Sequence, residues 1–149
     1  MNEVAGVKRI GWLALLWCAA WSGDLIAAWI HAPYDRLGAV AALAWSLAFG
    51  SAARTTRDLS GFWLFAGGVA SFVGVAGELN VAQHAALAMV AAAIVGGRSK
   101  GYWLLFLAVG WMPALGWAMR WAGPVATNLI RLLDSGIALG LAWRWRRAL

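Results

Sequence analysis

Six apolar segments of membrane-spanning length follow one another along this chain of 149 residues, separated by short hydrophilic breaks. The hydrocarbon core of a bilayer is about 30 Å thick, so a spanning helix needs about 20 mainly apolar residues. The six segments are residues 10–30, 37–53, 60–77, 81–97, 102–121 and 124–143. We therefore predict an all-α integral membrane protein with a single transmembrane domain over residues 1–149. Its short connections favour antiparallel neighbours in a compact bundle of about six helices.

The positive charges predict an orientation for this bundle. Cytoplasmic loops of membrane proteins carry an excess of Lys and Arg. Nine of the 12 Lys and Arg residues fall on one side of the pattern: Lys8, Arg9, Arg54, Arg57, Arg98, Lys100, Arg144, Arg146 and Arg147. Arg36 and Arg120 fall on the other side, and Arg131 lies within the last segment. We predict a multi-pass protein of the bacterial inner membrane with both termini cytoplasmic. The net charge of +6 follows from this same rule and gives no support to nucleic-acid binding.

Small residues predict where the helices pack closely. Gly67, Ser71 and Gly74 recur at three- and four-residue spacing on the third segment, which lets two helix backbones approach in lipid. Together with the Ala-rich fourth segment they predict a tight hairpin that turns at residues 77–80. Pro113 should kink the fifth segment, and Pro124 suits the first turn of the sixth.

Four of the 12 Trp residues fall deep within the segments: Trp17, Trp21, Trp45 and Trp111. A buried indole needs packing partners, which can be other protein side chains or a flat ligand. We favour packing within the protein for all four.

Polar and ionisable residues gather toward the outer side of the predicted bundle. An ionisable group inside a membrane is costly unless it is paired or hydrated, so each is a functional candidate by default. The candidates are Asp24, His31, Asp35, Arg36, Glu78, Asn80, His84, Arg120, Asn128, Arg131 and Asp134.

Arg131 needs a carboxylate partner within the membrane. A helix rises about 1.5 Å per residue, which puts Asp24 and Arg131 both roughly 10 Å from the outer end of their segments. Asp134 competes as a partner on the same helix face, three residues after Arg131. The sequence leaves both pairings open, and a purely structural pair is the simpler interpretation of either.

His31 and His84 are candidate ligands for a cofactor. Histidine is a common axial ligand of haem, and a chlorophyll-type pigment or a quinone is also conceivable in such a bundle. The simpler alternative is an ordinary interfacial histidine, which we favour for His31. The two histidines lack the spacing of a metal motif, and Cys18 is the only cysteine, so we predict no metal site.

Three stretches give the chain a resemblance to a known family. They are Tyr34-Asp35-Arg36-Leu37-Gly38, Trp103-Leu104-Leu105-Phe106-Leu107 and Trp111-Met112-Pro113. The chain resembles the amino-terminal part of exosortase and archaeosortase-type multi-pass membrane proteins. That resemblance implies a transpeptidase outside the membrane that uses Cys, Arg and His, with Asn128 and Arg131 matching an Asn-x-x-Arg motif. No Cys-Ser-Gly follows the fifth segment, so the resemblance implies a shared scaffold without the shared catalysis.

Three functions remain open on this basis. We favour a non-catalytic subunit of a larger inner-membrane assembly, in contact with lipid and other membrane proteins. Such an assembly could be energy-transducing or carry a pigment or haem. The second hypothesis is a reduced exosortase-like sorting or processing factor that acts at the outer leaflet. The third is a small transporter or proton conductor.

Overall fold

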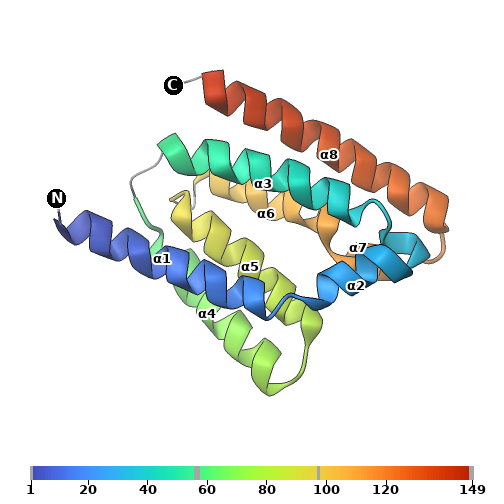
Figure 1. The fold of residues 1–149 in the computed structure, drawn as a ribbon, viewed down its shortest axis with the longest axis horizontal. Coiled ribbons are helices and arrows are strands. Elements are labelled where there is room, and N and C mark those ends of the chain that lie inside the picture. Colours follow the sequence, from blue (N-terminus) through green and yellow to red (C-terminus); the bar gives the residue numbers. More distant parts are fainter. Residues whose placement is uncertain (1, 56–57, 97, 148–149) are drawn as a thin grey trace. The chain divides into compact units, whose positions relative to one another are not determined.

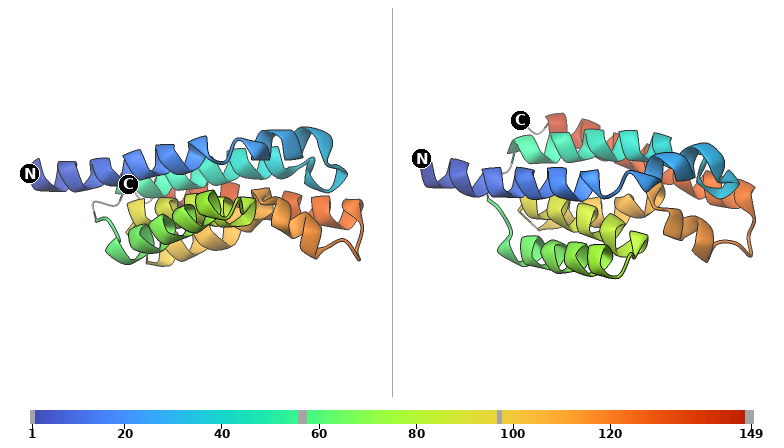
Figure 2. Two further views of the ribbon diagram at one scale, coloured as in Figure 1. Left: turned by 90° about the horizontal axis from the view of Figure 1, so that it is seen from below. Right: turned by 60° about the horizontal axis from the view of Figure 1, so that its bottom comes forward.

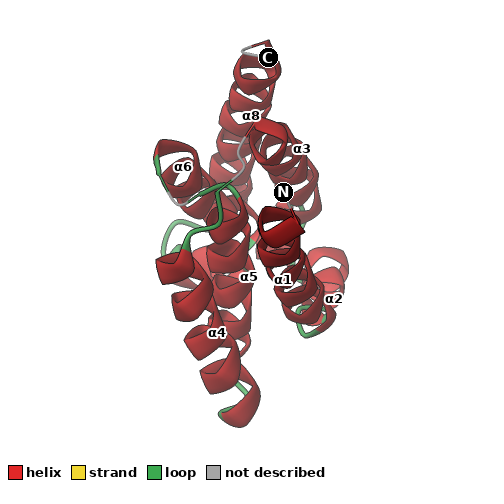
Figure 3. Ribbon diagram, turned by 90° about the vertical axis from the view of Figure 1, so that its left-hand side faces the viewer, coloured by secondary structure: helices red, strands yellow, loops and turns green. Residues whose placement is uncertain are grey.

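The computed structural model describes residues 2–55, 58–96 and 98–147, and in these residues every regular element is a helix (Figures 1 and 3). Arg57 and Gly97, which belong to the predicted breaks and spans, lie outside this range. The α-helices are α1 (Asn2–Ala20), α2 (Asp24–His31), α3 (Gly38–Thr55), α4 (Gly61–Ala76), α5 (Asn80–Ile94), α6 (Ser99–Ala108), α7 (Pro113–Ala118) and α8 (Pro124–Arg147). Two short 3₁₀ helices, η1 (Pro33–Asp35) and η2 (Val109–Trp111), interrupt the series. The prediction of an all-α fold is confirmed.

Two helical stretches are long and apolar enough to cross a membrane, namely Pro33–Arg54, which joins η1 to α3, and Pro124–Arg147. A third span results if Lys8–Ala20 and Asp24–His31 are counted together across their break. Helices α4 and α5 are apolar but have only 16 and 15 residues. At about 1.5 Å per residue they are shorter than a typical hydrocarbon core.

The predicted first and fifth segments are helical but not continuous, which corrects the expectation of six simple helices. The first breaks at residues 21–23, where the Ser22 hydroxyl donates to the Cys18 carbonyl at 2.9 Å. The fifth is divided into α6, η2 and α7. Pro113 has no N–H to donate, and its ring clashes with the carbonyl four residues earlier, so the predicted kink becomes a complete break.

The chain packs as two compact units: residues 1–22 with 52–105, and residues 23–51 with 106–149. In the first unit, α4 and α5 lie side by side as the predicted hairpin (Figure 1), turning at residues 77–79. Gly67, Ser71 and Gly74 are all buried. A Cβ on Gly67 would lie 2.7 Å from Val90 Cγ2, and a Cβ on Gly74 would lie 2.9 Å from the Gln83 nitrogen. The glycines therefore bring the two backbones together, as the sequence predicts.

In the second unit, η1, η2 and α7 pack against α8, which Figure 2 shows in red and orange. Trp45 of α3 and Trp111 of η2 are buried and meet edge to face, with ring centroids 5.5 Å apart. The prediction of packing within the protein is confirmed for this pair. Trp17 and Trp21, in the first unit, contact each other at 5.9 Å but are 56% and 43% exposed. These two indoles therefore pack against each other, as predicted, but much of their surface is left uncovered by the chain.

We predict that Gly67→Ala destabilises the hairpin by about 1–3 kcal/mol, because the new methyl group would force apart two helices already in contact. Gly68→Ala is the matched control, since a Cβ there meets no heavy atom within 4 Å. Unfolding in a denaturing-detergent titration, followed by circular dichroism, measures both variants. Equal stability of the two variants would contradict the packing role of Gly67.

Candidate functional site

Arg131 is the centre of the polar structure in the second unit. Its side chain projects from α8 and is completely buried. Nε donates to the Tyr34 carbonyl at 3.0 Å, and Nη1 donates to the carbonyls of Gly110 and Met112 at 2.8 and 3.0 Å. Nη2 donates to Asp35 Oδ1 at 2.5 Å. A guanidinium has five N–H groups, so these four bonds occupy most of its donor capacity.

The acceptors on one side of the guanidinium come from the break before Pro113. A helix that ends leaves its last carbonyls without intrahelical partners. Here the carbonyls of Gly110 and Met112 accept from Arg131, and the carbonyl between them, at Trp111, accepts from Trp29 Nε1 at 3.1 Å. Side chains from α8 and α2 thus satisfy three successive carbonyls at the break. These bonds allow the helix to break in a buried part of the unit without leaving the three carbonyls unpaired.

The acceptors on the other side come from η1. Pro33 fixes the first turn of this 3₁₀ helix, and the Asp35 nitrogen donates to the Ala32 carbonyl at 3.1 Å. The turn directs Asp35 inward, where it is only 6% exposed. Gly116 of α7 packs against the pair, since a Cβ there would lie 3.0 Å from Asp35 Oδ1.

Asp35 is therefore the partner of Arg131, which corrects both pairings left open by the sequence. Heights along straight helices predict Asp24 or Asp134 as the partner of Arg131, and they place Asp35 in a hydrophilic break between two segments. The 3₁₀ turn returns that break to the interior of the unit. Asp134 lies near Arg131 and interacts with it through its charge, but it receives none of its hydrogen bonds.

Asn128, which lies on α8 one helical turn before Arg131, also bonds to the segment that contains η1. Its Oδ1 accepts from the Leu37 nitrogen at 3.2 Å, and its Nδ2 donates to the Pro33 carbonyl at 3.0 Å. A second bond from Nδ2 reaches the Pro124 carbonyl at 2.9 Å. Asn128 and Arg131 together hold both ends of η1. The Asn-x-x-Arg spacing therefore serves as a clamp on the backbone in this chain.

Asp134 is the remaining ionisable group of this site. It is 9% exposed, and its Oδ2 has no hydrogen-bond partner among the described residues. A Cβ on Gly110 would overlap this carboxyl group, so the absence of a side chain at Gly110 makes room for it. Asp134 also lines a groove of about 270 Å³.

The structure separates most of the other predicted site residues from this cluster. In the second unit, Asp24 is half-buried, and His31 and Arg120 are exposed. Arg36 is also exposed, but it lies at the edge of the cluster, where it lines a groove with Pro33 and Asn128. Glu78, Asn80 and His84 belong to the first unit, where Glu78 and Asn80 are exposed and His84 is buried. Of the predicted candidates, the structure brings together Asp35, Asn128, Arg131 and Asp134. The carbonyls before Pro113 are not among the predicted site groups, although a helix-breaking proline is the signal that such acceptors exist.

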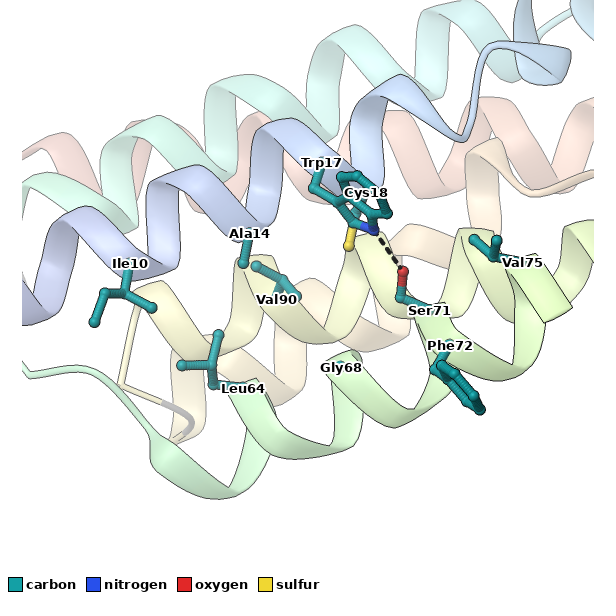
Figure 4. A pocket seen from close by; sticks show the side chains of 10 residues that line it. All are labelled: Ile10, Ala14, Trp17, Cys18, Leu64, Gly68, Ser71, Phe72, Val75 and Val90. Carbon is teal, nitrogen blue, oxygen red and sulfur yellow. Dashed lines mark hydrogen bonds between the residues drawn. The ribbon is translucent and has the colours of Figure 1, made fainter.

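The first unit has a second candidate feature, an apolar groove of about 410 Å³ between α1, α4 and α5 (Figure 4). Two of its lining residues are joined by a hydrogen bond, in which Trp17 Nε1 of α1 donates to Ser71 Oγ of α4 at 3.2 Å. The other lining residues are Ile10, Ala14, Cys18, Leu64, Gly68, Phe72, Val75 and Val90. The single cysteine is buried here, 3% exposed. Such a surface suits an apolar contact rather than chemistry.

Two further findings bear on the chemistry available. Among the described residues, no group of three or more His, Cys, Asp and Glu side chains is arranged to hold a metal ion. No protein-family model, curated protein or solved structure matches this chain.

We predict that Asp35 and Arg131 are energetically coupled. Removing one partner of a buried ion pair costs about 3–5 kcal/mol, because the other charge is left buried alone. In a double-mutant cycle of Asp35→Ala and Arg131→Ala, the coupling energy should reach about 1–3 kcal/mol. The matched cycle of Asp24→Ala with Arg131→Ala should be additive within about 0.5 kcal/mol. Coupling to Asp24 instead of Asp35 would refute this assignment.

We also predict that Gly110→Ala costs about 1–3 kcal/mol, since the added methyl group occupies the space of the Asp134 carboxyl. Gly136→Ala on α8 is the control, because a Cβ there meets no heavy atom within 4 Å. Alanine at that position should be neutral or stabilising by up to about 1 kcal/mol. Thermal unfolding of both purified variants in one detergent makes the comparison. A neutral Gly110→Ala would show that the carboxyl has free space around it.

Proposed function

We propose that this chain is a non-catalytic, multi-pass subunit of a larger inner-membrane assembly. One observation carries the proposal. Arg131 is the strongest candidate for a functional charged residue, and it donates four hydrogen bonds to acceptors of its own chain. A guanidinium that recognises a substrate must have donors directed at that substrate. Here the donors are directed at two backbone breaks and at Asp35.

The membrane part of the proposal comprises six spans with both termini in the cytoplasm. Two stretches of sufficient length and apolarity support it, as do the apolar side chains on the outside of the units. On α4, Phe62, Phe65 and Phe72 are each more than 70% exposed, on the helix that buries its small residues against α5. Aromatic side chains exposed to this extent suit contact with lipid or with other membrane helices.

The same observation weighs against the processing factor. The resemblance to exosortase-type proteins stays a prediction, and it would assign a catalytic role to Arg131. Arg131 and Asn128, which carry the matching motif, are instead bonded to the η1 turn and to the break before Pro113. The geometry therefore favours a shared scaffold in which this motif holds the backbone.

The apolar groove of the first unit is a surface on which a partner helix can dock. Its volume of about 410 Å³ holds several apolar side chains, and Gly68 at its wall leaves the entrance open. Packing of side chains into such spaces is what holds helices together in lipid, where no hydrophobic force acts between them.

The test is native mass spectrometry of the tagged protein after gentle extraction from the membranes of its own host. A subunit should be recovered with other proteins in a defined stoichiometry. Recovery at 15.9 kDa or a simple multiple of it, together with solute transport or processing activity, would refute the proposal.

A groove-filling variant sharpens that test. We predict that Gly68→Leu reduces co-purification of the partner several-fold, because a Cβ at Gly68 meets no heavy atom within 4 Å and the rest of the leucine side chain would fill part of the groove. Gly140→Leu on α8 is the control, since a Cβ there also meets nothing within 4 Å and the residue lies outside the groove. Thermal stability of each variant is measured alongside, so that loss of fold is distinguished from loss of contact. Equal co-purification in both variants would remove the groove from the interface.

A further inference from the structure

The polar cluster of the second unit has one negative charge in excess. It contains two carboxyl groups, Asp35 and Asp134, and a single guanidinium, Arg131. Arg131 directs its hydrogen bonds to Asp35 and to three carbonyls, so Asp134 receives none of them. The ion-pair partner of Arg131 is thus Asp35, which lies at hydrogen-bond distance. Asp134 is left with a buried oxygen that has no partner in the described part of the chain.

The surroundings of Asp134 offer nothing else to neutralise that charge. The groove beside it is lined by apolar residues from three elements besides α8: Phe106 from α6, Val109 and Gly110 from η2, and Leu115 from α7. From α8 itself come Ile130, Leu133 and Ile137. None of these lining residues is titratable, and among the described residues the charged groups near Asp134 are Arg131 on the same helix and Asp35, the ion-pair partner of Arg131, on η1.

The position of Asp134 along α8 puts this group far from both membrane surfaces. It is the eleventh of the 24 residues of that helix. At about 1.5 Å per residue it lies roughly 15 Å from the first residue of α8 and roughly 20 Å from the last. The rim of the groove is exposed, since Phe106 and Leu133 are 65% and 62% accessible. In a membrane these residues face lipid.

We propose that Asp134 is a proton-binding site within the membrane, open to the lipid phase through this groove. Asp134 feels the charge of Arg131 but receives none of its hydrogen bonds, and a carboxylate that is buried in apolar surroundings without such bonds is more stable when it takes up a proton. The proton removes the excess charge of the cluster, and the space that Gly110 leaves accommodates the neutral carboxyl group. This goes beyond the proposed subunit role, because it adds a group that can take up and release a proton at mid-membrane.

The reagent that tests this site is dicyclohexylcarbodiimide, which dissolves in lipid and reacts with protonated carboxyl groups. The acid proton moves to a carbodiimide nitrogen while the carboxyl oxygen adds to the central carbon. Migration of the acyl group from oxygen to nitrogen then gives a stable N-acylurea, and no group leaves. The product retains every atom of both reactants, so peptide mass spectrometry of the wild-type protein locates the modified residue directly.

We expect one reagent molecule per chain, on the peptide that contains Asp134, and slower labelling as the pH rises because the reaction consumes the protonated form. A water-soluble carbodiimide should label Asp134 at least several-fold more slowly. Asp134→Asn should abolish the modification, whereas Asp24→Asn should leave it unchanged. Labelling of Asp24 or Glu78 instead, no labelling, or equal labelling by the water-soluble reagent would overturn the proposal.

A pair of groove variants tests access from lipid without touching the carboxyl group. Ile137→Trp enlarges a side chain at the edge of the groove and should slow labelling several-fold. Leu132→Trp places the same indole on an exposed position of α8 outside the groove and should not. Equal labelling rates in the two variants would refute entry through the groove, even if Asp134→Asn fails to fold.

Discussion

The second unit depends on one constraint, the need to satisfy backbone carbonyls where helices break in a buried core. Each buried carbonyl left without a hydrogen-bond partner costs about 1–3 kcal/mol. The chain breaks twice in this unit, at η1 and before Pro113, and Arg131 reaches acceptors at both places. A single side chain on the continuous helix α8 thus makes two discontinuities tolerable. The positions of η1, η2 and α7 in that unit follow from these bonds.

Arginine suits this task better than lysine would. Its planar guanidinium offers five donors in a fixed fork, so it can hold acceptors that lie on different sides of the group. Lysine has three donors on a flexible stem and could not span the Tyr34 carbonyl, Asp35 and the break before Pro113 together. Asn128, one turn earlier, bonds to Pro33 at the start of η1 and to Leu37, two residues after its end. Asp35 neutralises the guanidinium, and a buried cation needs such a partner.

Sequence patterns predicted the helices and the α4–α5 hairpin because both depend on local features: apolar runs, small residues at helical spacing, and a polar turn. The partner of Arg131 depends on a non-local feature. The prediction assumed straight helices and exposed breaks, whereas the Pro33 turn carries Asp35 inward. Pro113 did signal a disturbed helix. The height of a residue along its helix can be calculated from the sequence, but the distance between two helices cannot. The sequence therefore did not show that the freed carbonyls lie next to Arg131.

The cluster contains residues whose interactions stabilise the fold and one residue, Asp134, whose burial destabilises it. Arg131, Asp35 and Asn128 form a closed set in which each charge or carbonyl has a partner, and folding alone accounts for it. Asp134 adds a second buried carboxyl group, and a glycine in η2 is required to admit it. Both features are unfavourable for stability, since glycine raises the entropy of the unfolded chain and a buried acid needs a proton or a partner. Features that destabilise a fold without a compensating interaction are where function is best sought. Here the buried acid and the glycine that admits it meet at Asp134.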